Sequence, residues 1–145
     1  MNDIFTKNNI KLNVKADTKD EAIRMAGEIL VERGYVEASY LDAMYDREEA
    51  ASTYMGNYVA IPHGTDDAKD AVLKSGLSLL QIPEGVSFGE DKEVKLVIGI
   101  AGKNNEHLEL LQKIALVCSD VSRVEELVEA DTEEAVLDLF DQVEA

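Results

Sequence analysis

One of the two histidines in the chain, His63, stands between a proline and a glycine in the segment Tyr58-Val59-Ala60-Ile61-Pro62-His63-Gly64-Thr65. Pro62 fixes its own φ and favours an extended Ile61, so the apolar run before it should end abruptly. Gly64 has no side chain, so a ligand can approach the backbone beside His63. Imidazole gains and loses a proton near neutral pH and can act as a nucleophile. The segment predicts an imidazole held in a fixed direction beside open space; an ordinary surface-loop histidine is the alternative.

Two further side chains could help such an imidazole to handle an anion. His107 follows Asn104 and Asn105, either of which suits an N-cap, so His107 should lie in the first turn of a helix. The amides and the dipole there favour a bound anion and a neutral imidazole. Arg47, near the end of another predicted helix, could bind phosphoryl oxygens through its planar pair of donors. The alternatives are a surface histidine at a helix start and an exposed ion pair of small value.

Several other kinds of site are not supported by the sequence. The segment Gly99–Asn104 lies where a phosphate-binding loop would lie, but Val97 occupies the first glycine position and Asn104 replaces the required serine or threonine. No dinucleotide-type glycine spacing is present. The histidines lie 44 residues apart and the only thiol is Cys118 on an apolar helix face, so a zinc site is poorly supplied. Cys118 is expected to be core packing. We therefore expect neither a cofactor nor a metal.

Size and composition favour one globular domain over residues 1–145. The chain has 46% apolar and 30% charged residues, its apolar runs are too short for a membrane span, and its N-terminus lacks the plan of a signal peptide. A single cysteine fits a reducing cytoplasm. The net charge of −16 argues against a nucleic-acid partner. Residues 121–145 carry nine carboxylates and one arginine, or −8. This acidic segment is either a solvated helix face or a surface that steers a basic protein partner.

Hydrophobic periodicity predicts alternating strands and helices. Strands are expected at 10–14, 54–61, 76–82 and 94–101, and helices after a Thr18–Glu21 capping box up to Gly34, from 36 to 49, and at 106–118, 122–129 and 132–144. The 94–101 strand is apolar on both sides, so it should be central. The 106–118 helix should turn Leu108, Leu111, Ile114, Ala115 and Cys118 inward. The fold class is α/β: a single layered domain with a mixed sheet of about five strands and helices on both faces.

Five motifs occur in order over nearly the whole chain: Met44-Tyr45-Asp46-Arg47-Glu48-Glu49, Tyr54-Met55-Gly56-Asn57, Ile61-Pro62-His63-Gly64-Thr65, Pro83-Glu84-Gly85-Val86-Ser87-Phe88-Gly89 and Val97-Ile98-Gly99-Ile100-Ala101-Gly102. In these motifs the chain resembles the enzyme IIA component of the bacterial phosphoenolpyruvate-dependent sugar phosphotransferase system, mannitol/fructose type. The stretch Asn104-Asn105-Glu106-His107 resembles the mannitol branch in particular.

The resemblance implies a phosphotransferase component with a phosphohistidine intermediate. The phosphocarrier protein HPr would phosphorylate His63, and His63 would pass the group to a cysteine of the IIB part of a membrane-bound IIB/IIC mannitol permease. The second site histidine of the family falls on His107 and the site arginine on Arg47. Amides near Gly64 and Thr65 are candidates for holding phosphoryl oxygens.

The same residues are compatible with two alternative functions. A regulatory, nitrogen-type IIA module would use phosphorylation of His63 to control protein binding, but the mannitol-like stretch argues against it. A hydrolase with His63 as general base lacks a well-framed serine or carboxylate partner in the sequence.

Overall fold

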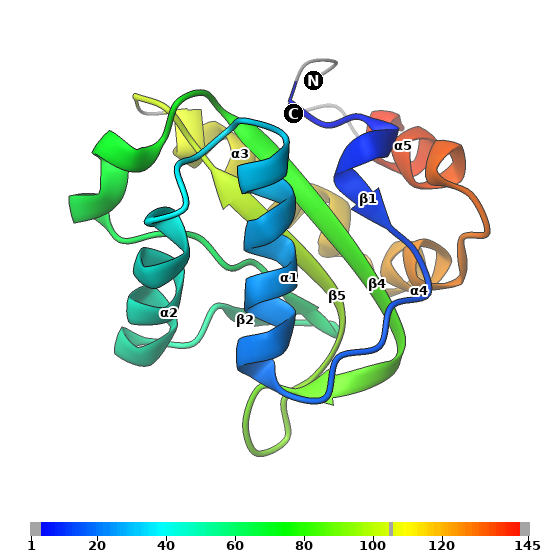
Figure 1. The fold of residues 1–145 in the computed structure, drawn as a ribbon. Coiled ribbons are helices and arrows are strands. Elements are labelled where there is room, and N and C mark those ends of the chain that lie inside the picture. The colour runs from blue at the N-terminus through cyan, green and yellow to red at the C-terminus, as the bar shows by residue number, and fades with distance from the viewer. Residues whose placement is uncertain (1–3, 105, 143–145) are drawn as a thin grey trace.

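The computed structural model describes residues 4–104 and 106–142. Its strands and helices are interleaved along the chain, mostly in runs of two or three elements of one kind (Figure 1). In chain order they are η1 (Lys7–Asn9), β1 (Ile10–Lys11), α1 (Lys19–Glu32), α2 (Tyr40–Ala50), β2 (Tyr54–Gly56), β3 (Val59–Ala60), η2 (Asp66–Ala71), β4 (Gly76–Ser87), β5 (Glu93–Ala101), α3 (Glu106–Cys118), α4 (Val121–Glu129) and α5 (Glu133–Asp141).

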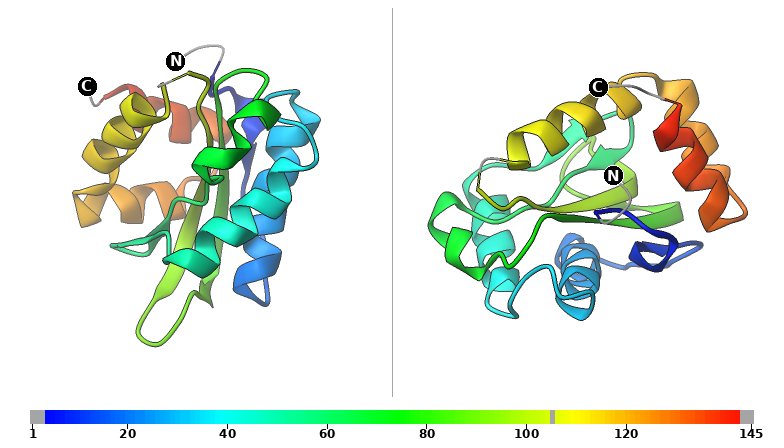
Figure 2. Two further views of the ribbon diagram at one scale, coloured as in Figure 1. Left: turned by 90° about the vertical axis from the view of Figure 1, so that its left-hand side faces the viewer. Right: turned by 90° about the horizontal axis from the view of Figure 1, so that it is seen from above.

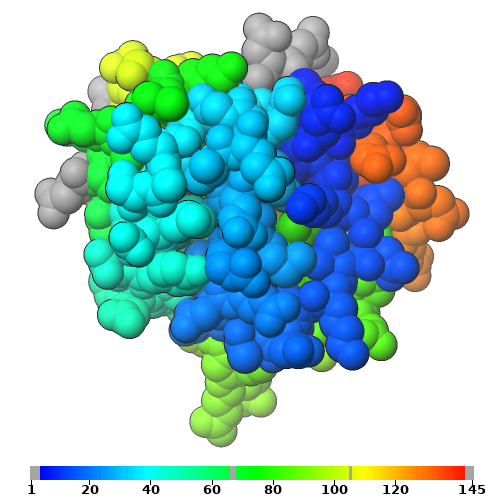
Figure 3. All heavy atoms as spheres, in the orientation of Figure 1, coloured from blue at the N-terminus to red at the C-terminus, as the bar shows by residue number. Residues whose placement is uncertain are grey.

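The strands form one mixed sheet in the order β1-β4-β5-β3-β2. β4 and β5 pair antiparallel, whereas β1 runs parallel to β4 and β3 parallel to β5. This confirms the predicted α/β class, the five-stranded mixed sheet and the central position of β5. The β4–β5 turn extends beyond the body of the molecule, below α1 and α2 in Figure 3.

Helices cover both faces of the sheet (Figure 2). One hydrophobic cluster joins α1 and α2 to one face and includes Val97 and Ala101 of β5. The other joins α3, α4 and α5 to the opposite face and includes Leu96 and Ile98. β5 therefore supplies apolar side chains alternately to two cores, as a strand covered on both faces must. Val94, at the start of β5, also packs with the α1 cluster.

The capping residues predicted at the two ends of α1 are confirmed. Thr18 accepts a hydrogen bond from the Glu21 amide at 3.1 Å and starts α1, and Gly34 ends it with a φ of +77°. Thr132 caps α5 in the same way through the Ala135 amide. The last part of the helix expected at 132–144 lies outside the described residues, within which α5 ends at Asp141. No helix in the described part of the chain is long and apolar enough to span a bilayer.

Several sequence expectations were wrong in whole or in part. The helix expected from 36 begins at Tyr40, and the strand expected at 76–82 continues to Ser87. The 10–14 strand is shorter, because Asn13 takes a φ of +53° just after β1. The 54–61 run is a hairpin of β2 and β3 rather than one strand; Asn57 and Tyr58 turn it with φ of +54° and +70°. The expected inner face of α3 is confirmed for Ile114 and Cys118, which are buried, and for Leu111, which packs partly buried against the core. It is wrong for Leu108 and Ala115, which are exposed; Leu110 and Val117 are buried instead.

Candidate functional site

Parallel pairing of β3 with β5 decides where His63 lies. The chain continues past β3 alongside β5, so the Ile100 amide donates to the Pro62 carbonyl at 2.9 Å and His63 pairs with Ile100 in an isolated parallel bridge. Parallel strands end at the same edge of a sheet, so the segment after β3 and the segment after β5 emerge together. His63 and the start of α3 are thereby brought to one place.

The His63 ring is partly exposed, and its Nδ1 atom lies 2.8 Å from the Ile61 carbonyl oxygen. A carbonyl oxygen can only accept, so Nδ1 carries the proton of this hydrogen bond. In the neutral ring the in-plane lone pair then belongs to Nε2. The sequence left open which nitrogen is nucleophilic; the backbone of the same short segment selects Nε2.

An open pocket of about 770 Å³ surrounds this ring. All five site residues predicted from the sequence line it: Arg47, His63, Gly64, Thr65 and His107. They come from the end of α2, the loop after β3 and the first turn of α3. The pocket therefore joins three segments that are far apart in the sequence.

Gly64 packs directly against the ring of Tyr40. A Cβ on Gly64 would lie 2.5 Å from Cε1 of the Tyr40 ring, so its absence makes room for that ring. The Tyr40 hydroxyl accepts from the Gly64 amide at 2.8 Å and donates to the Ile100 carbonyl at 2.9 Å. The Gly64 amide is thus engaged by Tyr40 in this structure, and its role in holding a phosphoryl oxygen stays a prediction. Burial raises the pKa of the Tyr40 phenol, against a smaller lowering by the Gly64 amide, so the hydroxyl keeps its proton.

His107 is the second residue of α3, in the first turn as predicted. A Cβ on Gly102 would collide with the backbone and Cβ of His107, so only glycine allows β5 and α3 to meet this closely. The turn is held further by the Glu106 amide, which donates to the Lys103 carbonyl at 3.1 Å. Asn104 lines the pocket with a φ of +61°, and Asn105, the other proposed N-cap, lies outside the described residues.

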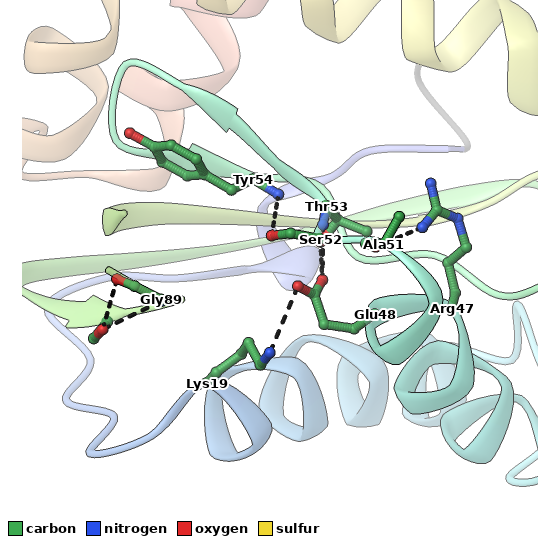
Figure 4. A network of polar contacts seen from close by, with 9 residues as sticks. Lys19, Arg47, Glu48, Ala51, Ser52, Thr53, Tyr54 and Gly89 are labelled. Carbon is green, nitrogen blue, oxygen red and sulfur yellow. Dashed lines mark hydrogen bonds and ion pairs between the residues drawn. The ribbon is translucent and has the colours of Figure 1, made fainter. Parts of the chain in front are cut away.

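Positive charge gathers in this pocket. Arg47 is partly exposed, and its Nη1 donates to the Ala51 carbonyl at 2.6 Å (Figure 4). The ion pairs found among the described side chains are Lys19–Glu48 and Arg24–Glu28, so neither occupies Arg47. Lys69 of η2 also lines the pocket. Among the lining residues whose side chains are described there is no carboxylate, in a protein of net charge −16. The pocket is suited to an anion.

Sequence reasoning missed Tyr40 and Lys69 as site residues. Tyr40 had the signal of a core residue, because it falls on the apolar side of α2, and only its hydroxyl contacts separate it from that role. Lys69 carries no local motif. Cys118, by contrast, is buried as expected, and burial raises the pKa of its thiol to about 12. It is not a nucleophile at neutral pH.

A second hollow of about 810 Å³ lies beside the β2–β3 hairpin and the β4–β5 turn. Its lining includes Tyr54, Tyr58 and Lys92 but neither histidine nor Arg47. No imidazole or guanidinium occurs among its lining residues, and carboxylates of Asp91 and Glu93 do, so it suits an anion less well than the His63 pocket.

Comparisons with known proteins agree with this arrangement. Residues 3–143 match the family model described as phosphoenolpyruvate-dependent sugar phosphotransferase system, EIIA 2. The mannitol-specific phosphotransferase enzyme IIA component of Geobacillus stearothermophilus is 59% identical over 140 residues, which are 97% of each chain.

Solved structures agree as well. In the complex of enzyme IIA mannitol with phosphorylated enzyme IIB mannitol from Escherichia coli, a chain 47% identical superposes with a TM-score of 0.91 over 96% of this chain and 98% of that one. The nitrogen regulatory protein IIA-Ntr of Neisseria meningitidis is 29% identical, with a TM-score of 0.81 over 94% and 96%. The family match over nearly all residues, together with identity near 60% to a full-length relative, shows that this chain belongs to the EIIA type 2 family of the phosphoenolpyruvate-dependent sugar phosphotransferase system.

Proposed function

We propose that this chain is a cytoplasmic phosphoryl carrier of mannitol uptake, formed as one EIIA domain over residues 1–145. His63 accepts the phosphoryl group from phospho-HPr and passes it to a cysteine of the mannitol IIB component. The observation that carries the proposal is the meeting of Arg47, His63 and His107 in one pocket of local positive charge.

The first transfer is a displacement at phosphorus by His63 Nε2. A bond forms between Nε2 and phosphorus while the bond from phosphorus to the donor imidazole breaks, and the electron pair of that bond leaves with the donor ring. The Nδ1 proton stays in its hydrogen bond to the Ile61 carbonyl, which fixes the ring direction. The second transfer repeats this displacement, with the thiolate of the IIB cysteine as nucleophile and His63 as leaving group.

Charge in the transition state spreads over the three equatorial oxygens of the phosphoryl group, so catalysis depends on positioned cations and donors. We assign this role to Arg47 and His107, with Thr65 as a candidate donor and Lys69 as an additional cation at the pocket. Loss of Arg47 or His107 should cost about 3 kcal/mol, or about 100-fold in rate, if it resembles the loss of one oxyanion-hole donor.

The comparisons favour transport over regulation. The mannitol-specific relatives are 59% and 47% identical to this chain, whereas the nitrogen regulatory protein is 29% identical. The Escherichia coli relative with a TM-score of 0.91 was solved together with phosphorylated IIB, which supports a IIB partner for this chain. HPr and the IIC part of the permease are partners that we infer from the family relationship.

The proposal is tested by incubating the protein with phosphoenolpyruvate, enzyme I and HPr. We expect one acid-labile, base-stable phosphate per chain, and none in His63→Ala. The matched variant His107→Ala keeps the label but acquires it about 100-fold more slowly. Undiminished labelling of His63→Ala would overturn the site.

A second measurement separates transport from regulation. The phosphorylated protein is mixed with an isolated mannitol IIB domain, and transfer of the label to the IIB cysteine is followed. We expect rapid transfer, with loss of label from His63. A stable phosphoprotein that does not donate to this domain would favour the regulatory module.

A further inference from the structure

Glu48 has a buried carboxylate that takes no direct part in the proposed phosphoryl transfer. The residue is 4% exposed, yet it lies at the end of α2 beside the partly exposed Arg47. Its Oε1 accepts two hydrogen bonds from Thr53, one from the backbone amide at 2.9 Å and one from the hydroxyl at 2.5 Å. In Figure 4 the carboxylate points away from Arg47, towards Thr53 on one side and Lys19 on the other.

This arrangement is costly for the fold. Oε2 is buried without a hydrogen bond among the described residues, and the Lys19 ammonium lies 3.8 Å from it. Burying a carboxylate that is only partly compensated is unfavourable, and an apolar side chain of similar size is often as good for stability. A role in holding other groups in place accounts better for a carboxylate at this position than stability does.

The groups that Glu48 holds lead to His63. The Thr53 carbonyl accepts from the Ile61 amide at 3.1 Å, and the Ile61 carbonyl is the acceptor of the His63 Nδ1 hydrogen bond. Glu48, Thr53, Ile61 and His63 are therefore connected by consecutive hydrogen bonds. Movement of Thr53 would shift the carbonyl that selects the tautomer of His63.

The same corner also holds Arg47. Its guanidinium donates to the Ala51 carbonyl, and the Ala51 amide donates back to the Arg47 carbonyl at 3.2 Å. Ala51 and Thr53 both belong to the three-residue connection between α2 and β2. Glu48 thus fixes one short segment from which two side chains of the pocket, His63 and Arg47, are oriented.

We infer that Glu48 is a positioning residue for phosphoryl transfer. This inference rests on the proposed function of His63. It contacts neither the phosphoryl group nor the partner protein. It acts by holding the Ala51–Thr53 corner, so that the Ile61 carbonyl keeps the proton on Nδ1 and the Arg47 guanidinium stays at the pocket.

The test compares Glu48→Ala, Glu48→Gln and Thr53→Val with the control Ser78→Ala. Ser78 donates a buried hydrogen bond to the Ala26 carbonyl, outside the His63 pocket, so its loss perturbs the core but not this corner. Each variant is assayed for kcat and KM with phospho-HPr at a temperature where thermal unfolding shows it fully folded. The His63 tautomer is read from the ¹⁵N shifts of its ring.

Glu48→Ala should lower kcat by roughly 10- to 100-fold, the range expected for a misplaced site, while KM stays close to that of the parent. Its ring shifts should show an increased share of the Nε2–H tautomer. Glu48→Gln keeps an oxygen acceptor for Thr53 and should recover most of the rate. Thr53→Val removes one of the two contacts and should lie between the parent and Glu48→Ala; it serves as the test if Glu48→Ala does not fold.

The inference would be overturned if Glu48→Ala and Thr53→Val had the same kcat and the same His63 tautomer ratio as Ser78→Ala. That outcome differs from failure of the proposed function, in which His63→Ala itself would still be phosphorylated.

Discussion

Tyr40 connects the two backbone segments that carry the pocket. Its hydroxyl accepts from the Gly64 amide and donates to the Ile100 carbonyl, so one buried phenol ties the loop after β3 to the end of β5. Both backbone groups would lose a partner if the hydroxyl were removed. This makes Tyr40 a support of the loop that carries His63, although it does not act on phosphorus.

We expect Tyr40→Phe to lose about 1–3 kcal/mol of stability, because two buried backbone groups are left unpaired. The rate of His63 phosphorylation should fall as the loop gains freedom, while the label remains on His63. Thermal unfolding and the labelling assay measure the two effects. Tyr45→Phe, on the same helix but outside the pocket, is the control. Equal rates and equal stabilities for the two variants would contradict the supporting role of Tyr40.

At the level of residues, chemistry was easier to predict than support. His63 and Arg47 were identified because their side-chain types and their local motifs indicate a reactive or anion-binding role. Tyr40 was not identified, because its hydroxyl contacts backbone groups 24 and 60 residues away along the chain. Glu48 was not identified, because its role depends on how the connection between α2 and β2 folds back to place Thr53 against it. A hydroxyl or carboxylate on a helix gives no signal in the sequence for which backbone group it will meet.

Among the elements, the contact between α1 and β5 depends on Gly99. A Cβ there would collide with the Ser78 hydroxyl and lie 3.3 Å from the Ala26 Cβ. Ser78 is the antiparallel partner of Gly99 and donates to the Ala26 carbonyl, so strand pairing and helix packing meet at this point. The central strand can approach α1 only because this position has no side chain.

Gly99→Ala should therefore cost about 1–3 kcal/mol of stability through overpacking. Removing the colliding hydroxyl should relieve part of this, so the double variant Gly99→Ala/Ser78→Ala should lose less than the sum of the two single losses. Chemical denaturation of the four proteins gives the coupling energy. If the two single losses of stability added up to the loss in the double variant, the Ser78 hydroxyl would not be the group that collides with the new Cβ.

The capped helix ends and the central strand were predictable, whereas the start of α2, the hairpin and part of the inner face of α3 were not. The 54–61 run is apolar enough for one strand, and its turn uses Tyr58 at a positive φ, where glycine is the usual signal. Part of the face of α3 was misassigned because Leu108, which is exposed, is as apolar as the buried Leu110 and Val117. Only the packing of α3 on the sheet decides which of them is covered, and it leaves Leu108 and Leu111 at the pocket.

Over the whole molecule the dominant physical feature is charge. The net charge is −16, and half of it falls in residues 121–145, which include α4 and α5. These helices lie on the opposite face of the sheet from α1 and α2 (Figure 2). Like charges on a compact surface repel one another and oppose folding. The His63 pocket is a local exception, with Arg47 and Lys69 at its lining.

We expect the melting temperature to rise with added sodium chloride, because salt screens this repulsion over about 10 Å at 0.1 M. The variant Glu125→Gln/Glu129→Gln, changed at two exposed positions of α4, should show a smaller rise. Calorimetry at low and moderate salt checks both. A melting temperature that falls or stays constant with salt would show that repulsion does not limit stability.

The sequence alone determined the class of fold, the central strand, the capped helix ends and the identity of the reactive side chains. These follow from local rules: periodicity reports which faces are apolar, capping residues act within one turn, and the chemistry of imidazole belongs to the residue itself. Each of these properties is set by neighbours a few positions away along the chain.

Tertiary structure alone decided which nitrogen of His63 holds the lone pair, that the Gly64 amide is engaged by Tyr40, and that Arg47 and His63 are positioned from one corner. The Tyr40 contact joins residues 24 positions apart along the chain. The other two contacts span only two and four positions, but each needs the backbone turn that the folded segment gives around Ile61 or Ala51. A hydrogen bond is short and directional, so it cannot be placed until the backbone on both sides of it has been placed.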